Sequence, residues 1–497
     1  MRRSILSLML MALAAASCQP SPTPSPSPEA TPTVSVAPSL APSETIAPPT
    51  VRPTSPPIAF YRLRIEITTT SDWTTLHLEP SAHLLTARVI STLGDPTYAD
   101  GGTGWMALNQ SLGAAEAGTS VGLTADLALE VAGAAEGWIL RIEKGHLGTT
   151  EVRVSVLTNG ELHLLGEFRH QGVAPNPGET NPRTFELDLT PLSEIEPEIE
   201  RSGSAAFPRL LWAFYYPWYT RPDWSSPMLR DHPVEPYNSA DRATIERHVR
   251  QAMSAGIDGF ISSWWGPGSD TDANLRTLLD VAQDEGFLVT VYFETLTGEG
   301  HLSASEITRW LTYALRNYGD HPAFARVDGK PVIVLWASGA VPLETWQQCL
   351  DSVRQSGLDV FTLGMGYSLS NLAVFDGLHE YGVFTIPDLE ATVAATGAGV
   401  DNYSLLEEQP APRLWAATVQ PGYDDRLIPG RDGLLQERDD GAFYRRTWEA
   451  ALASGPDWIF ISTWNEWWEH THIEPSQAFG DLYLDITREY AAAWKGE

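Results

Sequence analysis

The chain has 497 residues, a formal net charge of −31 and a sequence pI of about 4.7. So acidic a chain repels phosphate groups, which excludes nucleic acids and anionic lipid headgroups as partners. Its two cysteines are too few for a disulfide framework or a thiolate zinc site, and nothing in the sequence calls for a cofactor.

The first 18 residues read as an export signal. Arg2 and Arg3 precede an apolar run from Ile5 to Ala16, which is too short to cross a membrane. Small residues then lead to Cys18, as in a bacterial lipoprotein signal whose cysteine is acylated. We therefore expect a protein on the extracellular side of the bacterial membrane, touching that membrane only through a lipid on Cys18. Ordinary secretion is the alternative.

Two segments of different character follow. Residues 19–57 are almost all Pro, Ser, Thr and Ala, which cannot bury a core, so they predict a disordered linker. Residues 58–199 contain runs with period two, such as Tyr61, Leu63 and Ile65, separated by Gly, Asn and Pro. This pattern predicts an all-β, sandwich-like domain. Carbohydrate binding and a spacer role both remain open for it.

Residues 208–497 alternate apolar strands with amphipathic helices. We place the eight strands at Leu210–Tyr215, Gly259–Ser262, Leu288–Phe293, Val332–Leu335, Val360–Leu363, Val374–Leu378, Leu414–Thr418 and Trp458–Ser462. Helices are expected over Ala243–Ala255, Leu275–Asp284, Glu306–Tyr318, Val341–Gln355 and Ala442–Ala453. Eight such units predict an α/β fold, a (β/α)8 TIM barrel.

In such barrels the chemistry lies at the C-terminal ends of the strands. Six of the eight predicted ends carry aromatic residues or carboxylates. Aromatic faces stack on sugar rings and carboxylates bind hydroxyl groups, so these ends predict a sugar-binding cleft. The candidate substrate-binding residues are Tyr215, Tyr216, Tyr219, Trp264, Trp265, Glu294, Trp336, Tyr423, Trp464, Asn465, Trp467 and Trp468.

Glu466 and Glu469, just past the last strand, are the candidate catalytic residues. In a helical turn this spacing places their Cβ atoms about 5–6 Å apart. Two carboxylates so close, flanked by tryptophans, resist joint ionisation, so one pKa should rise, which suits a general acid. Glycosidic cleavage needs such an acid and a second carboxylate. The alternative is an exposed glutamate pair on a surface helix.

Four further residues have weaker claims. Glu294 ends a predicted strand and should point into the cleft, where it either binds substrate or supports the pair. Glu474 is expected either to support the catalytic pair through other residues or to have a structural role. His470 and His472 could bind a metal, but the sequence offers no third ligand, so no metal is predicted.

The segment ISTWNEWWEHTHIEP resembles the catalytic signature of family 99 glycoside hydrolases, which include endo-α-mannosidases and endo-α-1,2-mannanases. Their motif commonly reads N-E-W-H-E-G-T-x-I-E-P. Four further blocks resemble that family: FYYPWY (214–219), SSWWGP (262–267), HPAFARVDGKPVIVL (321–335) and QPGYDDR (420–426). The resemblance covers roughly residues 208–497 and leaves out the predicted sandwich.

The resemblance implies a retaining mechanism of an uncommon kind. Glu466 would take the proton of the sugar 2-hydroxyl, which attacks its own anomeric carbon. Glu469 would protonate the leaving group and then activate water. Direct nucleophilic attack by Glu466 is the ordinary alternative. Trp468 and His470 stand where the best-known members have His and Gly, which should alter the subsites.

The sequence therefore predicts an exported glycoside hydrolase that acts on an α-linked polysaccharide or oligosaccharide. A surface glycan-binding lipoprotein without catalysis is one alternative. Others are a relative of the family 71 α-1,3-glucanases and a polysaccharide-biosynthesis protein. The last would need a nucleotide-sugar site, and the sequence has no Gly-rich phosphate loop.

Overall fold

The computed structural model describes residues 58–496 with short gaps. The gaps are 72–73, 80–82, 95, 100–110, 115–118, 132–134, 145–147, 172–182, 201–206, 298–299, 408–410 and 432. The predicted signal, Cys18 and the predicted linker lie outside the described residues. Within the described part of the chain, no helix has the length and apolar character needed to cross a membrane.

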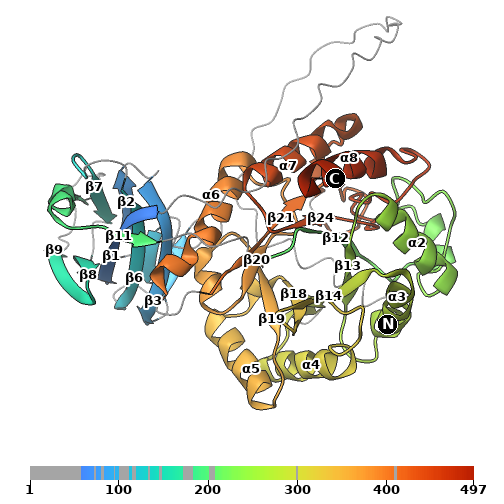
Figure 1. The fold of residues 1–497 in the computed structure, drawn as a ribbon, viewed down its shortest axis with the longest axis horizontal. Coiled ribbons are helices and arrows are strands. Elements are labelled where there is room, and N and C mark those ends of the chain that lie inside the picture. Colours follow the sequence, from blue (N-terminus) through green and yellow to red (C-terminus); the bar gives the residue numbers. More distant parts are fainter. Residues whose placement is uncertain are drawn as a thin grey trace, which may run out of the picture.

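The N-terminal part consists of two antiparallel sheets (Figure 1). One has the order β3-β6-β1-β8-β9, with β11 also paired to β1, and the other has the order β10-β7-β2-β5-β4. Tyr61, Leu63 and Ile65 are buried, as the period-two pattern predicts. The strands are β1 (Ile58–Thr69), β2 (Thr74–Glu79), β3 (Leu84–Leu93), β4 (Pro96–Ala99), β5 (Ser111–Ala114), β6 (Val121–Glu130), β7 (Ile139–Lys144), β8 (Thr149–Thr158), β9 (Glu161–Gln171), β10 (Arg183–Asp188) and β11 (Glu198–Glu200).

The C-terminal part is a closed barrel of eight parallel strands, which confirms the predicted fold class. Neighbouring strands pair in chain order, and β14 pairs with β18 while β24 pairs with β12 to close the ring. The eight strands are β12 (Leu210–Tyr215), β13 (Gly259–Trp264), β14 (Leu288–Glu294), β18 (Lys330–Trp336), β19 (Phe361–Met365), β20 (Gly377–His379), β21 (Leu414–Val419) and β24 (Trp458–Ile461). The sixth strand is shorter and lies later than predicted.

Helices cover the outside of the barrel (Figure 1). They are α2 (Arg242–Ser254), α3 (Asp270–Glu285), α4 (Ala304–Asn317), α5 (Leu343–Gln355), α6 (Leu389–Asp401), α7 (Ala442–Ala453) and α8 (Leu482–Lys495). Only the short 3-10 turn η6 (Leu369–Ala373) separates β19 from β20. Two helices, α6 and α8, were not predicted. α6 is rich in small residues because it packs tightly: a Cβ at Gly397 would lie 2.2 Å from the Ser454 carbonyl oxygen.

The core of the barrel has two layers, because residues alternate sides along each strand. In β12, Trp212 and Phe214 belong to an inner cluster that fills the barrel. Leu211, Ala213 and Tyr215 face outward and pack under the helices. This alternation decides which side chains at the strand ends can meet inside the barrel.

The two parts of the chain are joined by a packed interface. β3 lies against α6, η6 and η7 (Tyr403–Leu406), and β6 also touches η7. Arg62 of β1 donates to the Leu405 carbonyl oxygen at 2.8 Å and pairs with Glu198 at 2.9 Å. Phe60 and Leu406 belong to a small buried apolar cluster at this contact. The interface fixes the sandwich against the side of the barrel, at the segments before and after β20.

Candidate active site

The loop after β24 carries the two predicted catalytic glutamates. It is a turn rather than the helical turn expected from their spacing. The N–H of Thr471 donates to the Glu466 carbonyl oxygen at 3.2 Å, and His470 adopts a left-handed φ of 55°. The Glu466 N–H donates to the Thr463 hydroxyl at 2.8 Å, which fixes the start of the turn.

Glu466 is fully buried, with an exposed fraction of 0%. Its Oε1 accepts hydrogen bonds from the Tyr219 hydroxyl at 2.9 Å and from the Trp468 N–H at 3.1 Å. Its Oε2 has no hydrogen-bond partner among the described residues. One oxygen is therefore held in place while the other is left for a ligand.

Glu469 lies in a different electrostatic environment. Arg431 donates to its Oε1 at 2.8 Å, and the Tyr381 hydroxyl donates to its Oε2 at 3.1 Å. Arg431 also pairs with Asp425 at 3.2 Å, and its side chain is only 4% exposed. Burial alone would lower the pKa of Arg431, but Glu469, Tyr423 and Asp425 raise it above its ordinary value. A permanent cation thus lies against Glu469.

The pKa of Glu466 is raised well above its ordinary value, chiefly by burial and further by the charge of Glu469. The hydrogen bonds from Tyr219 and Trp468 and the charge of Arg431 act in the opposite direction. The sequence predicts that one pKa of the pair should rise, and in the structure it is the pKa of Glu466. The raised pKa favours the protonated form of Glu466, the residue to which the resemblance assigns the role of base.

Glu294 extends this carboxylate cluster from the end of β14. Burial raises the pKa of Glu294 to about 8, the hydrogen bond from Ser263 lowers it, and Glu469 adds to the rise. Ser263 donates to Glu294 at 2.6 Å and accepts from the Trp265 indole N–H at 3.2 Å. Glu294 is therefore neutral near pH 7 and orients Trp265 through Ser263.

Aromatic side chains surround the glutamates. The Tyr216 hydroxyl donates to the Tyr381 hydroxyl at 3.0 Å, which links it to Glu469. Trp468 stacks on Trp218 with ring centroids 5.9 Å apart and meets Tyr219 edge-on. Trp336 packs against the same inner cluster.

Tyr423 lies beside this aromatic group. It stacks on Phe384 at 4.2 Å, and its hydroxyl donates to Asp425 at 3.0 Å. The same hydroxyl accepts a hydrogen bond from Arg431 at 2.9 Å, so Arg431 links Tyr423 to Glu469.

Three predicted substrate-binding residues do not face the glutamates. Tyr215, Trp264 and Trp464 are fully buried in the layer between barrel and helices. Tyr215 bonds to His248, and the Trp264 indole donates to Asp272. These predictions were wrong because they placed residues at strand ends without assigning the side of the strand.

Asn465 and Trp467 also differ from their predicted role. Both are fully buried, and neighbouring residues already bind the Asn465 amide and the Trp467 indole N–H. Asn465 accepts from the Tyr216 N–H and donates to the Tyr216 carbonyl oxygen, at 2.7 and 3.1 Å. The Trp467 ring stacks on His472 with centroids 3.8 Å apart. They support the loop from behind.

Two residues that the sequence did not single out complete the site, Arg431 and Tyr381. Arg431 lies in a loop with no recognisable motif, so its contact with Glu469 could be found only in three dimensions. Tyr381 was detectable, since the sixth predicted strand is followed by His379, Glu380 and Tyr381, an acidic and aromatic strand end like the others.

A profile of glycosyl hydrolase family 99 matches residues 232–490, just over half of the chain. The chain belongs to glycosyl hydrolase family 99. It is 27% identical to the glycoprotein endo-alpha-1,2-mannosidase of Rattus norvegicus over 55% of this chain and 70% of that protein. For the Mus musculus protein of the same name, the identity is 26% over 62% of this chain and 77% of that protein. The solved family 99 endo-alpha-mannosidase of Bacteroides thetaiotaomicron matches with a TM-score of 0.51 and 26% identity, over 58% of this chain and 97% of that one.

This family 99 protein is therefore a glycoside hydrolase, as predicted. The family match begins after the two antiparallel sheets, so it says nothing about the sandwich. The two departures from the family motif lie in different places. Trp468 is among the aromatic residues around Glu466, whereas His470 turns toward Phe479 and His472 behind the loop. Of the two, only Trp468 is placed to alter a subsite.

Neither His470 nor His472 belongs to a metal site in the described part of the chain, where no group of three or more candidate ligands occurs. His472 lies 3.4 Å from Asp231, and burial lowers the pKa of His472 to about 4. Burial lowers the pKa of His470 to about 2. Both imidazoles are therefore neutral packing groups in this family 99 barrel.

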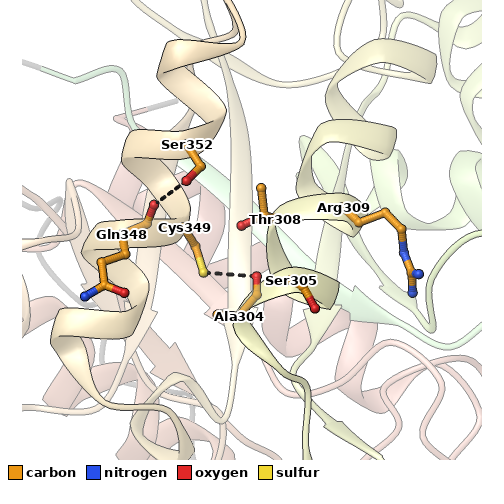
Figure 2. A pocket seen from close by; sticks show the side chains of 7 residues that line it. All are labelled: Ala304, Ser305, Thr308, Arg309, Gln348, Cys349 and Ser352. Carbon is orange, nitrogen blue, oxygen red and sulfur yellow. Dashed lines mark hydrogen bonds between the residues drawn. The ribbon is translucent and has the colours of Figure 1, made fainter.

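A groove of about 450 Å³ lies between α4 and α5, on the outside of the barrel (Figure 2). Its lining includes Thr308, Arg309 and Cys349. The Cys349 thiol donates to the Ala304 carbonyl oxygen at 3.3 Å, and burial raises the pKa of this thiol. A protonated, hydrogen-bonded thiol is a poor nucleophile. All of its lining residues lie on α4 and α5, so the groove is apart from the residues at the strand ends.

Proposed function

We propose that this protein is an exported, endo-acting and retaining α-mannosidase that uses Glu466 and Glu469. The observation that carries the proposal is the free, buried Oε2 of Glu466 beside a second glutamate that is held by Arg431 and Tyr381. Such an arrangement suits two carboxylates with separate tasks in glycosidic cleavage. The names of the family relatives, which are endo-α-mannosidases, support α-linked mannose as the sugar.

In the proposed reaction, Glu466 Oε2 takes the proton of the 2-hydroxyl, and O2 attacks the anomeric carbon of the same sugar. The bond from that carbon to the glycosidic oxygen breaks, and Glu469 gives its proton to the leaving oxygen. Water then opens the 1,2-anhydro sugar, giving one proton to Glu469 while Glu466 returns its proton to O2. Two inversions at one carbon give net retention.

These roles require the shared proton to lie on Glu469 when substrate is bound. However, burial raises the pKa of Glu466, and Arg431 lies 2.8 Å from the Glu469 carboxylate. This observation favours a second assignment, in which Glu466 is the acid and Glu469 the attacking or assisting base. In either case the protons belong to the coupled pair rather than to one residue.

A substrate with an activated leaving group separates the two assignments, because it needs no general acid. If Glu469 is the acid, the Glu469→Gln variant should cleave an activated α-mannoside far better than an oligosaccharide, while Glu466→Gln cleaves neither. The reverse pattern would establish the second assignment. Equal losses on both substrates would contradict both assignments.

The substrate class is tested with purified protein and a panel of glycans. We expect cleavage of α-1,2-linked mannan to oligosaccharides, seen by mass spectrometry, with products of retained configuration seen early by NMR. The control glycan is α-1,3-glucan, and a nucleotide sugar should not change the products. Release of oligosaccharides from α-1,3-glucan but not from mannan would contradict this proposal. Transfer of a sugar that requires the nucleotide sugar would contradict it as well.

The predicted placement outside the cell rests on the apolar run before Cys18 and on the linker of residues 19–57. Together they would hold the barrel away from the membrane on a lipid anchor. Metabolic labelling with a radioactive fatty acid should mark the wild type and leave the Cys18→Ala variant unlabelled. Label in neither protein, with both in the medium, would indicate simple secretion.

A further inference from the structure

A buried carboxylate that the proposed reaction does not use lies behind the catalytic loop. Glu474 is 4% exposed. Its Oε2 accepts hydrogen bonds from the Tyr237 hydroxyl at 2.8 Å and from the Trp467 indole N–H at 3.2 Å. Its Oε1 lies 2.9 Å from Nε2 of His248, which is fully buried on α2. Glu474 thus ties the loop to the helix layer.

The contacts of Glu474 reach both chain neighbours of Glu466. Trp467 is bound directly, and Asn465 donates to the Tyr237 hydroxyl at 3.3 Å. Glu474 is therefore at the centre of the contacts that hold the peptide units before and after Glu466.

One of these contacts continues to the Glu466 carboxylate itself. The Trp467 N–H donates to the Tyr219 hydroxyl at 2.9 Å, so this oxygen is already occupied as an acceptor. The hydroxyl hydrogen of Tyr219 is then directed to Oε1 of Glu466, also at 2.9 Å. A displacement of Trp467 would release the Tyr219 hydroxyl from this orientation.

We propose that Glu474 is a positioning residue: by holding Trp467 and Tyr237, it directs the Tyr219 hydroxyl to Oε1 of Glu466 and leaves Oε2 for the substrate. The proposal rests on the proposed function of Glu466. Glu474 acts through other residues and touches no reacting atom.

The positioning has a consequence for ionisation. The groups that face Glu466 are Tyr219, the Trp468 N–H, Glu469, Arg431, Tyr216 and Tyr381. Burial and Glu469 raise the pKa of Glu466, and the Tyr219 bond opposes that rise. Loss of Glu474 should weaken the Tyr219 bond, so the pKa of Glu466 should rise further. The acid limb of the kcat/KM profile should then move to higher pH.

The test compares Glu474→Ala and Glu474→Gln with wild type on an α-mannan oligosaccharide. In Glu474→Ala, kcat should fall about 10- to 100-fold while KM changes little, and the acid limb should shift upward. Glu474→Gln should recover most of kcat, because its amide oxygen accepts the same two bonds. Tyr237→Phe and Trp467→Phe each remove one hydrogen-bond donor to Glu474, so both should also lower kcat. These two variants replace Glu474→Ala in the test if Glu474→Ala does not fold.

Asp272→Ala is the matched control. Asp272 is also a buried carboxylate that accepts from a tryptophan and a tyrosine, but it lies in the outer layer with Trp264 and Tyr318. Its loss should lower the melting temperature without moving the pH profile. If Glu474→Ala behaves like Asp272→Ala, Glu474 is merely structural and the proposal is wrong.

A second measurement needs no substrate, so it separates failure of this proposal from failure of the proposed function. Thermal unfolding is followed across pH for wild type and Glu474→Ala, each with and without Glu466→Gln. A raised folded-state pKa makes stability fall as pH rises toward it. In Glu474→Ala this fall should extend to higher pH, and Glu466→Gln should abolish the difference. An unchanged pH dependence would overturn the proposal even if the enzyme cleaves no mannan.

Discussion

The surroundings of Glu466 and Glu469 differ although the two residues share one turn. Glu466 is enclosed by Tyr219, the Trp468 backbone and aromatic rings, and within the described part of the chain no cationic side chain forms a hydrogen bond or ion pair with it. Glu469 meets the guanidinium of Arg431 and the Tyr381 hydroxyl. Burial raises the pKa of Glu466, whereas Glu469 is in contact with a cation, and such different surroundings allow one pair of carboxylates to divide the acid and base roles.

The largest effect should come from removing either carboxylate. Glu466→Gln and Glu469→Gln should each lower kcat on an unactivated oligosaccharide by about 10³-fold or more, since acid–base and nucleophilic roles contribute on this scale. Titration calorimetry should show that both variants still bind the sugar. Retention of more than a tenth of wild-type kcat by either variant would exclude it from the catalytic pair.

A smaller loss is expected when only the cation is removed. Arg431→Gln leaves Glu469 and Asp425 buried without a counter-charge, and breaking a buried pair in this way typically destabilises a protein by about 3–5 kcal/mol. We expect a lower melting temperature and a kcat reduced about 10- to 100-fold. Denaturant unfolding and steady-state kinetics measure the two effects. Unchanged kcat would show that the contrast between the two glutamates does not depend on Arg431.

Two adjacent tyrosines give the next comparison. The Tyr216 hydroxyl reaches Glu469 through Tyr381, whereas the Tyr215 hydroxyl bonds to His248 outside the barrel. Tyr216→Phe should lower kcat/KM several-fold. Tyr215→Phe should leave kcat/KM unchanged and lose about 1 kcal/mol of stability for its hydrogen bond. Equal kinetic losses in the two variants would contradict the assignment of inner and outer faces.

The last prediction concerns stability, with no effect on turnover required. Since burial raises the pKa of Glu294 from 4.5 to about 8, the folded protein holds a proton there that the unfolded chain has lost. The free energy of unfolding should therefore fall as pH rises between those values. Glu294→Gln should remove that fall, so it should gain on the order of 2–4 kcal/mol over wild type at pH 8 and little at pH 4. Parallel stability curves for the two proteins would refute the raised pKa.

The sequence predicts the architecture well, because period two in residues 58–199 and alternating β/α units after residue 208 are both strong signals. It fails where a strand is apolar on both faces. In Leu210–Tyr215 both sides are buried, so no polar residue marks which of Tyr215 and Tyr216 faces inward. Periodicity alone therefore could not separate the two tyrosines.

The pairing of Glu466 with Glu469 was predictable because both lie in one short segment. The cation was not, since Arg431 is 38 residues from Glu469 and lies in a loop. The helical turn predicted for this segment was wrong, because the spacing argument assumes helical backbone angles. His470 instead has a left-handed φ. Contacts made through tertiary structure, such as that of Tyr381, likewise require the folded chain.

The most direct test of the central claim is a crystal structure of the Glu469→Gln variant with an α-1,2-linked mannose oligosaccharide. The sugar 2-hydroxyl should lie within hydrogen-bond distance of Glu466 Oε2, with the glycosidic oxygen beside residue 469. An oligosaccharide bound away from both side chains, or a 2-hydroxyl directed away from Glu466, would contradict the claim that these two glutamates carry out the cleavage.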